Sequence, residues 1–96
     1  MGLEVSFSEE AYETLYAVLD FLEEKWGKNY SKKLLSNIYR KIDLISENPF
    51  IYEQTSIPGL RKANISNYTS LLYRLHNNEI RVMFFWDNRQ EPLFSN

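Results

Sequence analysis

Residues 68–87, YTSLLYRLHNNEIRVMFFWD, hold two largely apolar segments joined by a short polar turn. Alternation with a period of two is typical of half-buried strands. Asparagine tolerates the left-handed backbone that tight hairpin turns require, which suits Asn77-Asn78 to a two-residue turn. The stretch therefore predicts an antiparallel hairpin with strands over about 68–75 and 79–87.

The register that follows from this turn gives the hairpin two different faces. One face carries the pairs Leu75–Ile80, Tyr73–Val82, Leu71–Phe84 and Thr69–Trp86, and we expect it to pack against helices. The other carries Arg74–Arg81, Leu72–Met83, Ser70–Phe85 and Tyr68–Asp87. Opposed like charges are unfavourable, so the two arginines call for an anion or a carboxylate nearby. The apolar residues of this second face predict a partner-binding surface, unless loop 49–59 or the C-terminal tail covers it.

Two helices are predicted upstream of the hairpin. Apolar residues recur at helical spacing over 9–26, Ser8 is a suitable N-cap, and Gly27 is a natural stop. After the link Lys28-Asn29, a second apolar stripe runs to Asn48-Pro49. A link this short predicts an antiparallel helical hairpin. Val5–Phe7 reads as a short first strand and 60–65 as a weak one.

These elements make a single domain over 1–96, in the order β-α-α-β-β-β. The predicted fold class is α+β: a helical hairpin over about 9–47, packed on one face of a small, mainly antiparallel sheet, with its C-terminal strands over about 60–87. The absence of cysteine excludes disulfides and thiolate chemistry. No apolar run is long enough for a membrane span and no signal-peptide pattern is present, so we expect no membrane partner and a cytoplasmic location.

Charge is distributed unevenly along a chain whose net charge is −2. Residues 1–24 hold acidic side chains and no basic ones, whereas all 11 basic residues follow. This asymmetry fits an anionic partner, and it equally fits two antiparallel helices that attract each other.

Motifs for cofactor or metal chemistry are missing. There is no glycine-rich phosphate loop, and the single histidine, His76, lies at the predicted turn, where we expect it to be solvated. We therefore predict no cofactor and no metal. What remains on the sheet half is a set of cations: Arg61, Lys62, Arg74, Arg81 and Arg89. Arginine grips phosphate bidentately, and Tyr68 and Phe85 offer rings for base stacking, so the set suits RNA or an acidic protein partner.

The ordered features resemble a known family. They are the short first strand, the helical hairpin ending at Asn48-Pro49, then Gly59-Leu60-Arg61, Leu72-Tyr73-Arg74-Leu75, Ile80-Arg81-Val82, and Asp87-Asn88-Arg89-Gln90 with Pro92. Over roughly 4–92 this set is similar to the RelE/ParE superfamily of toxins from type II toxin–antitoxin systems. The resemblance implies a bacterial growth inhibitor that a cognate antitoxin neutralises.

The superfamily has two modes of action, and the sequence departs from one of them. RelE-like members cleave mRNA on the ribosome; for that mode the resemblance implies a catalytic Arg89, with Arg61, Lys62, Arg74 and Arg81 around the scissile phosphate. However, Thr69 stands where that branch often has arginine, and the tail offers Glu91 and Phe94 where it has acid–base groups. ParE-like members poison DNA gyrase, and the long helical hairpin resembles theirs.

We therefore favour a ParE-like toxin that is not a nuclease. The alternatives are a ribosome-dependent, metal-independent mRNA endoribonuclease and an inactive binding module on the same fold. The sequence leaves open whether the chain forms a homodimer, and whether Tyr68, Leu72, Met83 and Phe85 contact a partner.

Overall fold

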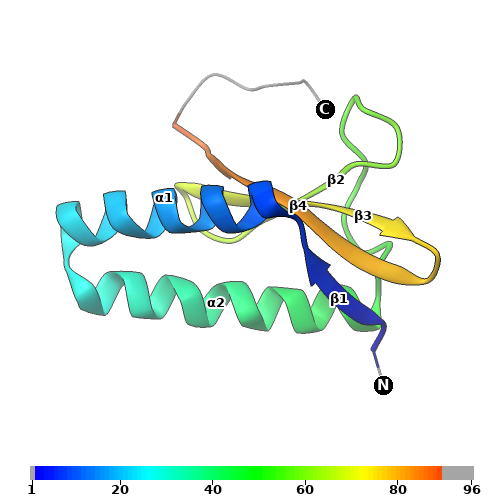
Figure 1. Cartoon of the computed structure of the whole chain (residues 1–96), viewed down its shortest axis with the longest axis horizontal. Coiled ribbons are helices and arrows are strands. Elements are labelled where there is room, and N and C mark those ends of the chain that lie inside the picture. The colour runs from blue at the N-terminus through cyan, green and yellow to red at the C-terminus, as the bar shows by residue number, and fades with distance from the viewer. Residues whose placement is uncertain (1, 90–96) are drawn as a thin grey trace.

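A computed structural model of the chain describes residues 2–89, and it has the predicted element order. The elements are β1 (Glu4–Phe7), α1 (Glu9–Trp26), α2 (Lys28–Glu47), β2 (Arg61–Asn64), β3 (Thr69–His76) and β4 (Glu79–Asp87). The two helices run side by side as a hairpin against one face of the sheet (Figure 1). The predicted α+β class is thereby confirmed. The predicted tail lies mostly outside the described residues.

The helical hairpin is tighter than predicted, because its link is a single residue. Ser8 caps α1 by accepting a hydrogen bond from the backbone N–H of Ala11 at 2.9 Å. Gly27 ends α1 with φ 94°, a left-handed value that glycine adopts without steric cost, and α2 begins directly afterwards. Lys28-Asn29, predicted as the link, is therefore the first turn of α2.

The sheet has the strand order β1-β4-β3-β2 and is mixed. β1 pairs with β4 in parallel, whereas β2 with β3 and β3 with β4 are antiparallel. β1 therefore joins the sheet at the edge opposite β2, although the whole helical hairpin separates it from β4 in sequence. The central strands are β3 and β4, which carry the site described below.

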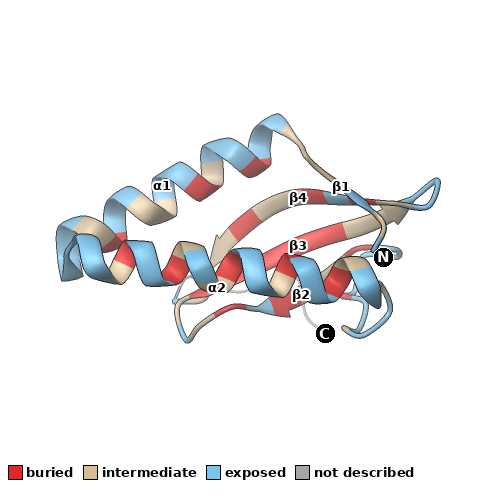
Figure 2. Ribbon diagram, turned by 90° about the horizontal axis from the view of Figure 1, so that it is seen from below, coloured by how far each residue is buried: buried red, intermediate tan, exposed pale blue. Residues whose placement is uncertain are grey.

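The core lies between the helices and one face of the sheet. It combines one stripe from each helix with residues of the strands that face the helices. Buried positions are red in Figure 2, and in β3 they include residues of both faces. The helical members are Ala11, Leu15, Leu22, Leu34, Ile38, Ile42 and Ile45, and the sheet members include Ala63, Leu71, Tyr73, Ile80, Val82 and Phe85.

The β3–β4 register follows the prediction near the turn and departs from it farther along. Asn77 and Asn78 have φ of 51° and 59°, as a two-residue turn requires, and the pairs Leu75–Ile80, Arg74–Arg81 and Tyr73–Val82 form. Leu72 then pairs with Phe84. Met83 is thus the extra residue of a β-bulge, and every predicted pairing beyond it is wrong by one residue.

The bulge reverses the predicted faces of the distal part of β4. Phe85 pairs with Leu71 and joins the core at 2% exposure, and Asp87 pairs with Thr69 on the helix side. Phe84 and Trp86 point to the opposite face. The prediction that Leu72, Met83 and Phe85 form an exposed surface is therefore wrong for Phe85 and Leu72. Leu72 is also fully buried, and it lies in a central strand between Lys62 and Phe84.

Candidate functional site

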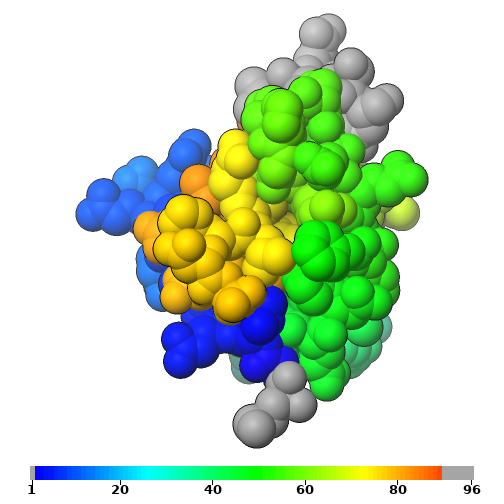
Figure 3. Space-filling view, turned by 90° about the vertical axis from the view of Figure 1, so that its right-hand side faces the viewer, coloured from blue at the N-terminus to red at the C-terminus, as the bar shows by residue number. Residues whose placement is uncertain are grey.

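The hairpin turn end of the sheet holds Arg74 and Arg81 directly opposite each other. Each guanidinium has its own partner: Arg74 donates to the carbonyl of Pro58 at 3.0 Å, and Arg81 donates to the Ser6 hydroxyl at 3.3 Å. The Ser6 hydroxyl in turn donates to a carboxylate oxygen of Glu79 at 2.7 Å. Glu79 is therefore linked to Arg81 through Ser6, whereas Arg74 is bound by a backbone carbonyl. Figure 3 looks onto this end, where the turn lies between the N-terminal residues and the connection after α2.

Arg61 and Lys62 are adjacent in β2 and therefore point to opposite faces. Arg61 lies on the helix face, where it donates to the carbonyl of Tyr52 at 2.6 Å and stands 5.0 Å from the centre of the Phe50 ring. Lys62 pairs with Leu72 on the other face. Of the predicted cations, only Lys62, Arg74 and Arg81 share a face of the sheet.

Arg89 lies at the other end of the sheet, just beyond the end of β4. Asp87 is six residues beyond Arg81 on the same strand, which is about 20 Å at roughly 3.3 Å per residue. The five predicted cations therefore do not surround one point, and no single phosphate could contact all of them. Glu91 and Phe94, which the sequence analysis also considered, lie outside the described residues.

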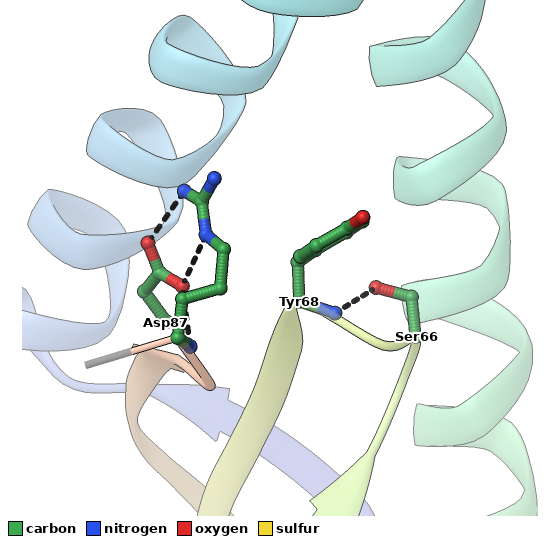
Figure 4. A network of polar contacts seen from close by, with 4 residues as sticks. Ser66, Tyr68 and Asp87 are labelled. Atoms are coloured by element: carbon green, nitrogen blue, oxygen red, sulfur yellow. Dashed lines mark hydrogen bonds and ion pairs between the residues drawn. The ribbon is translucent and has the colours of Figure 1, made fainter. Parts of the chain in front are cut away.

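Arg89 makes a two-pronged ion pair with Asp87, drawn in Figure 4. Its Nε and Nη2 donate to the two carboxylate oxygens at 3.1 and 2.8 Å, and its backbone N–H donates to the same carboxylate at 2.9 Å. These hydrogen bonds from Arg89 lower the pKa of the Asp87 carboxyl, and the hydrogen bond to Asp87 raises the pKa of Arg89. Both groups are therefore charged at neutral pH.

Aromatic rings flank this ion pair. The Arg89 guanidinium carbon lies 4.7 Å from the centre of the Phe21 ring and 5.2 Å from that of Tyr68. The Tyr68 ring packs on Trp26, with centroids 4.9 Å apart, and the backbone N–H of Tyr68 donates to Ser66 at 3.2 Å. These contacts bring the C-terminal half of α1 and the adjoining ends of β3 and β4 to one place.

A pocket of about 350 Å³ opens at this place. We call it the Arg89 pocket, and it is lined by Ala17, Val18, Phe21, Leu22, Tyr68, Asp87 and Arg89. Its wall is mostly apolar, with one carboxylate and one guanidinium. Among residues 2–89 no cluster of three or more His, Asp or Glu is arranged to hold a metal ion.

The sequence predicts Arg89 and Tyr68 as site residues, and the structure adds Asp87 and Phe21 to them. The predicted register places Asp87 opposite Tyr68 on the outer face, whereas it pairs with Thr69. Phe21 is 48% exposed on α1, and no sequence motif marks it. The apolar run from Val82 to Trp86 contains no polar residue that would specify which face each side chain takes, so the sequence carries no local signal for the bulge.

The opposite charges of the two helices do not meet in close ion pairs. Within residues 2–89, the one ion pair is Asp87–Arg89, so no carboxylate of α1 contacts a basic group of α2. The acidic and basic helix surfaces both face solvent. No helix in this range is long and apolar enough to cross a membrane.

Comparisons with known proteins give similarity in fold and none in sequence. No protein-family model and no curated protein matches the chain. A structure of the chromosomal ParDE toxin–antitoxin system from P. aeruginosa matches with a TM-score of 0.75 at 16% identity, over 88% of this chain and 95% of that one.

Two further structures match over similar lengths. The YoeB dimer from Staphylococcus aureus has a TM-score of 0.62 at 17% identity, covering 90% of this chain and 97% of that one. The E. coli DinJ–YafQ toxin–antitoxin complex has a TM-score of 0.61 at 16% identity, covering 93% and 96%. These matches define a class, that of small α+β domains with a helical hairpin on a mixed sheet. The chain therefore shares its fold with these three structures.

Proposed function

We propose that this protein is the toxin of a type II toxin–antitoxin system, that a cognate antitoxin binds and neutralises it, and that it is ParE-like rather than a nuclease. The toxin role is supported by the fold matches to structures of toxin–antitoxin systems. The ParE-like branch is supported by the TM-score of 0.75 with the ParDE structure, against 0.62 and 0.61 for YoeB and YafQ.

The observation that carries the non-nuclease proposal is the separation of the cations. An RNase of the RelE type needs basic groups around one phosphate, to stabilise its charge in the transition state. Here Arg74 and Arg81 lie at one end of the sheet, and Arg89 at the other is held by Asp87. A gyrase-type target, bound through protein surfaces, requires no such convergence.

Inducible expression in a bacterial host tests the proposal. We expect growth arrest without new mRNA 5′ ends, accompanied by a DNA-damage response. The Arg89→Ala variant should stay toxic, whereas for a nuclease it should lose most activity. Arg40→Ala, which removes a basic residue from the exposed surface of α2, is the matched control.

Other outcomes overturn parts of the proposal. Cleavage inside codons that requires ribosomes would establish the endoribonuclease, and an absence of arrest would establish an inactive binding module. Co-expression with the product of a neighbouring reading frame tests the antitoxin, which should restore growth and co-purify. Light scattering on the same material distinguishes a monomer from a homodimer.

A further inference from the structure

We infer that the Arg89 pocket is a binding site for the guanidinium group of an arginine side chain from a protein partner, and that the chain's own Arg89 occupies it in the free protein. Binding at this site is independent of the target on which the proposed toxin acts.

The pocket supplies the interactions that a guanidinium recognises. Asp87 accepts two parallel hydrogen bonds from Arg89, the fork geometry in which arginine pairs most strongly with carboxylate. Phe21 and Tyr68 present rings at 4.7 and 5.2 Å from the guanidinium carbon, within the range of cation–π attraction. Both types of interaction favour arginine, because its planar group can stack and form two bonds at once.

The aromatic side of this site is rigidly supported. Tyr68 packs on Trp26, and Trp26 packs on Tyr30 with centroids 5.0 Å apart, so rings from α1, α2 and the residue before β3 support one another. Lys25 lies 5.4 Å from the centre of the Trp26 ring and 5.9 Å from that of Phe21. These rings thus already attract two cations of this chain.

The space beside Arg89 is suited to a second side chain. The pocket retains about 350 Å³ with Arg89 forming part of its wall, and Ala17, Val18 and Leu22 line it with apolar surface. An entering arginine would lay its methylene stem along this surface and present its guanidinium to Asp87. A nucleic acid or an acidic surface carries no such cation, so the occupant is a protein segment that contains arginine.

Arg89 must leave for this exchange, and its position makes that feasible. Its side chain is 31% exposed, and its ion pair joins residues only two positions apart, so its release requires no movement of β4. Because Arg89 is tethered, it competes at an effective concentration in the millimolar range or above. The free protein should accordingly bind added arginine weakly, and a variant without Arg89 should bind it well.

Titration with N-acetyl-arginine amide, followed by NMR at the indole N–H of Trp26, tests the inference. N-acetyl-citrulline amide, which has the same stem and a neutral head, is the control probe. We expect Arg89→Ala to bind the arginine probe at least about tenfold more tightly than the wild type, because the tethered competitor is gone. Arg81→Ala removes an arginine at the other end of the sheet and should behave as the wild type.

Two further variants test the two-pronged bond of Arg89 and the carboxylate of Asp87. Arg89→Lys retains a cation without the two-pronged bond and should bind the probe with intermediate affinity. Combining Arg89→Ala with Asp87→Asn should abolish the preference for arginine over citrulline, while the amide spectrum reports that the fold persists. Equal binding of the two probes to Arg89→Ala, or equal arginine binding by Arg89→Ala and the wild type, would overturn the inference.

Discussion

The two halves of the β3–β4 hairpin differ in how regularly their strands pair. Between the turn and the Tyr73–Val82 pair, a regular ladder places residues as the turn dictates. Beyond Met83 the bulge shifts β4 by one residue, which moves Phe85 into the core and Asp87 to the helix side. The regular half carries the opposed pair Arg74 and Arg81, and the bulged half carries the Arg89 pocket. A one-residue irregularity therefore determines where the candidate site forms.

Hydrogen bonds with α1 and its N-cap residue, Ser8, stabilise the bulge. The Ser8 hydroxyl donates to the carbonyl of Met83 at 2.6 Å, and the backbone N–H of Ser8 donates to the carbonyl of Val82 at 3.0 Å. The backbone N–H of Phe85 donates to the Thr14 hydroxyl at 2.8 Å. Backbone groups of β4 at and beyond the end of β1 thus find partners on α1 and its cap, as burial requires.

The largest effect should come from truncating the residue that the bulge turns inward. Phe85→Ala removes a core ring and should lower the free energy of unfolding by about 3–5 kcal/mol. Met83→Ala, at the half-buried bulge position, should cost roughly 1 kcal/mol or less. Urea denaturation measures both. Equal losses of unfolding free energy in the two variants would contradict the placement of Phe85 in the core and of Met83 outside it.

A smaller effect should follow from removing the helix's bond to the bulge. Thr14→Val preserves shape but leaves the Phe85 N–H without its acceptor, which should cost about 1–2 kcal/mol. Ser36→Ala, at an exposed position on α2, is the control and should change stability by less than about 0.5 kcal/mol. Hydrogen exchange at Phe85 should also accelerate in Thr14→Val, and unchanged protection there would contradict the assignment.

The regular half offers a comparable test at Tyr73, whose hydroxyl donates to the carbonyl of Pro49 at 2.9 Å. Tyr73→Phe should cost about 1 kcal/mol at neutral pH. Burial raises the pKa of Tyr73, against an opposing effect of Arg61. The contribution of Tyr73 is therefore complete below the ordinary tyrosine pKa of about 10 and is lost as pH rises through the raised value. Thermal unfolding should show Tyr73→Phe to be less sensitive to alkali than the wild type.

The smallest effect should come from the ion pair in the bulged half. Arg89 lowers the pKa of Asp87, so the stabilisation is present above the ordinary aspartate pKa of 3.8 and is lost as pH falls through the lower pKa of the folded state. Asp87→Asn should therefore reduce the acid dependence of the melting temperature only at pH values below about 4. Glu24→Gln, on the exposed surface of α1, should leave that dependence nearly unchanged. A similar reduction of the acid dependence in both variants would contradict the assignment of this stabilisation to Asp87.

Much of the fold followed from local patterns. The caps at Ser8 and Gly27, the helical stripes and the Asn77-Asn78 turn each act within a few residues, and the structure contains all of them. The pairing of β1 with β4 was not predicted, because it joins segments more than 70 residues apart. Arg89 and Tyr68 were recognised as residue types suited to a site, but their neighbours Phe21 and Asp87 were assigned elsewhere.

Local patterns specify the element order, the α+β class and the register nearest the turn, since propensity, capping and turn geometry are local properties. The directions in which Phe85 and Asp87 point depend instead on long-range contacts. The apolar run of β4 would allow each of its side chains to lie on either face of the sheet. The observed arrangement depends on Ser8 and Thr14, which are distant in sequence and form hydrogen bonds with the backbone of Met83 and Phe85. The Arg89 pocket exists because three segments far apart in the chain meet there, which no single local pattern encodes.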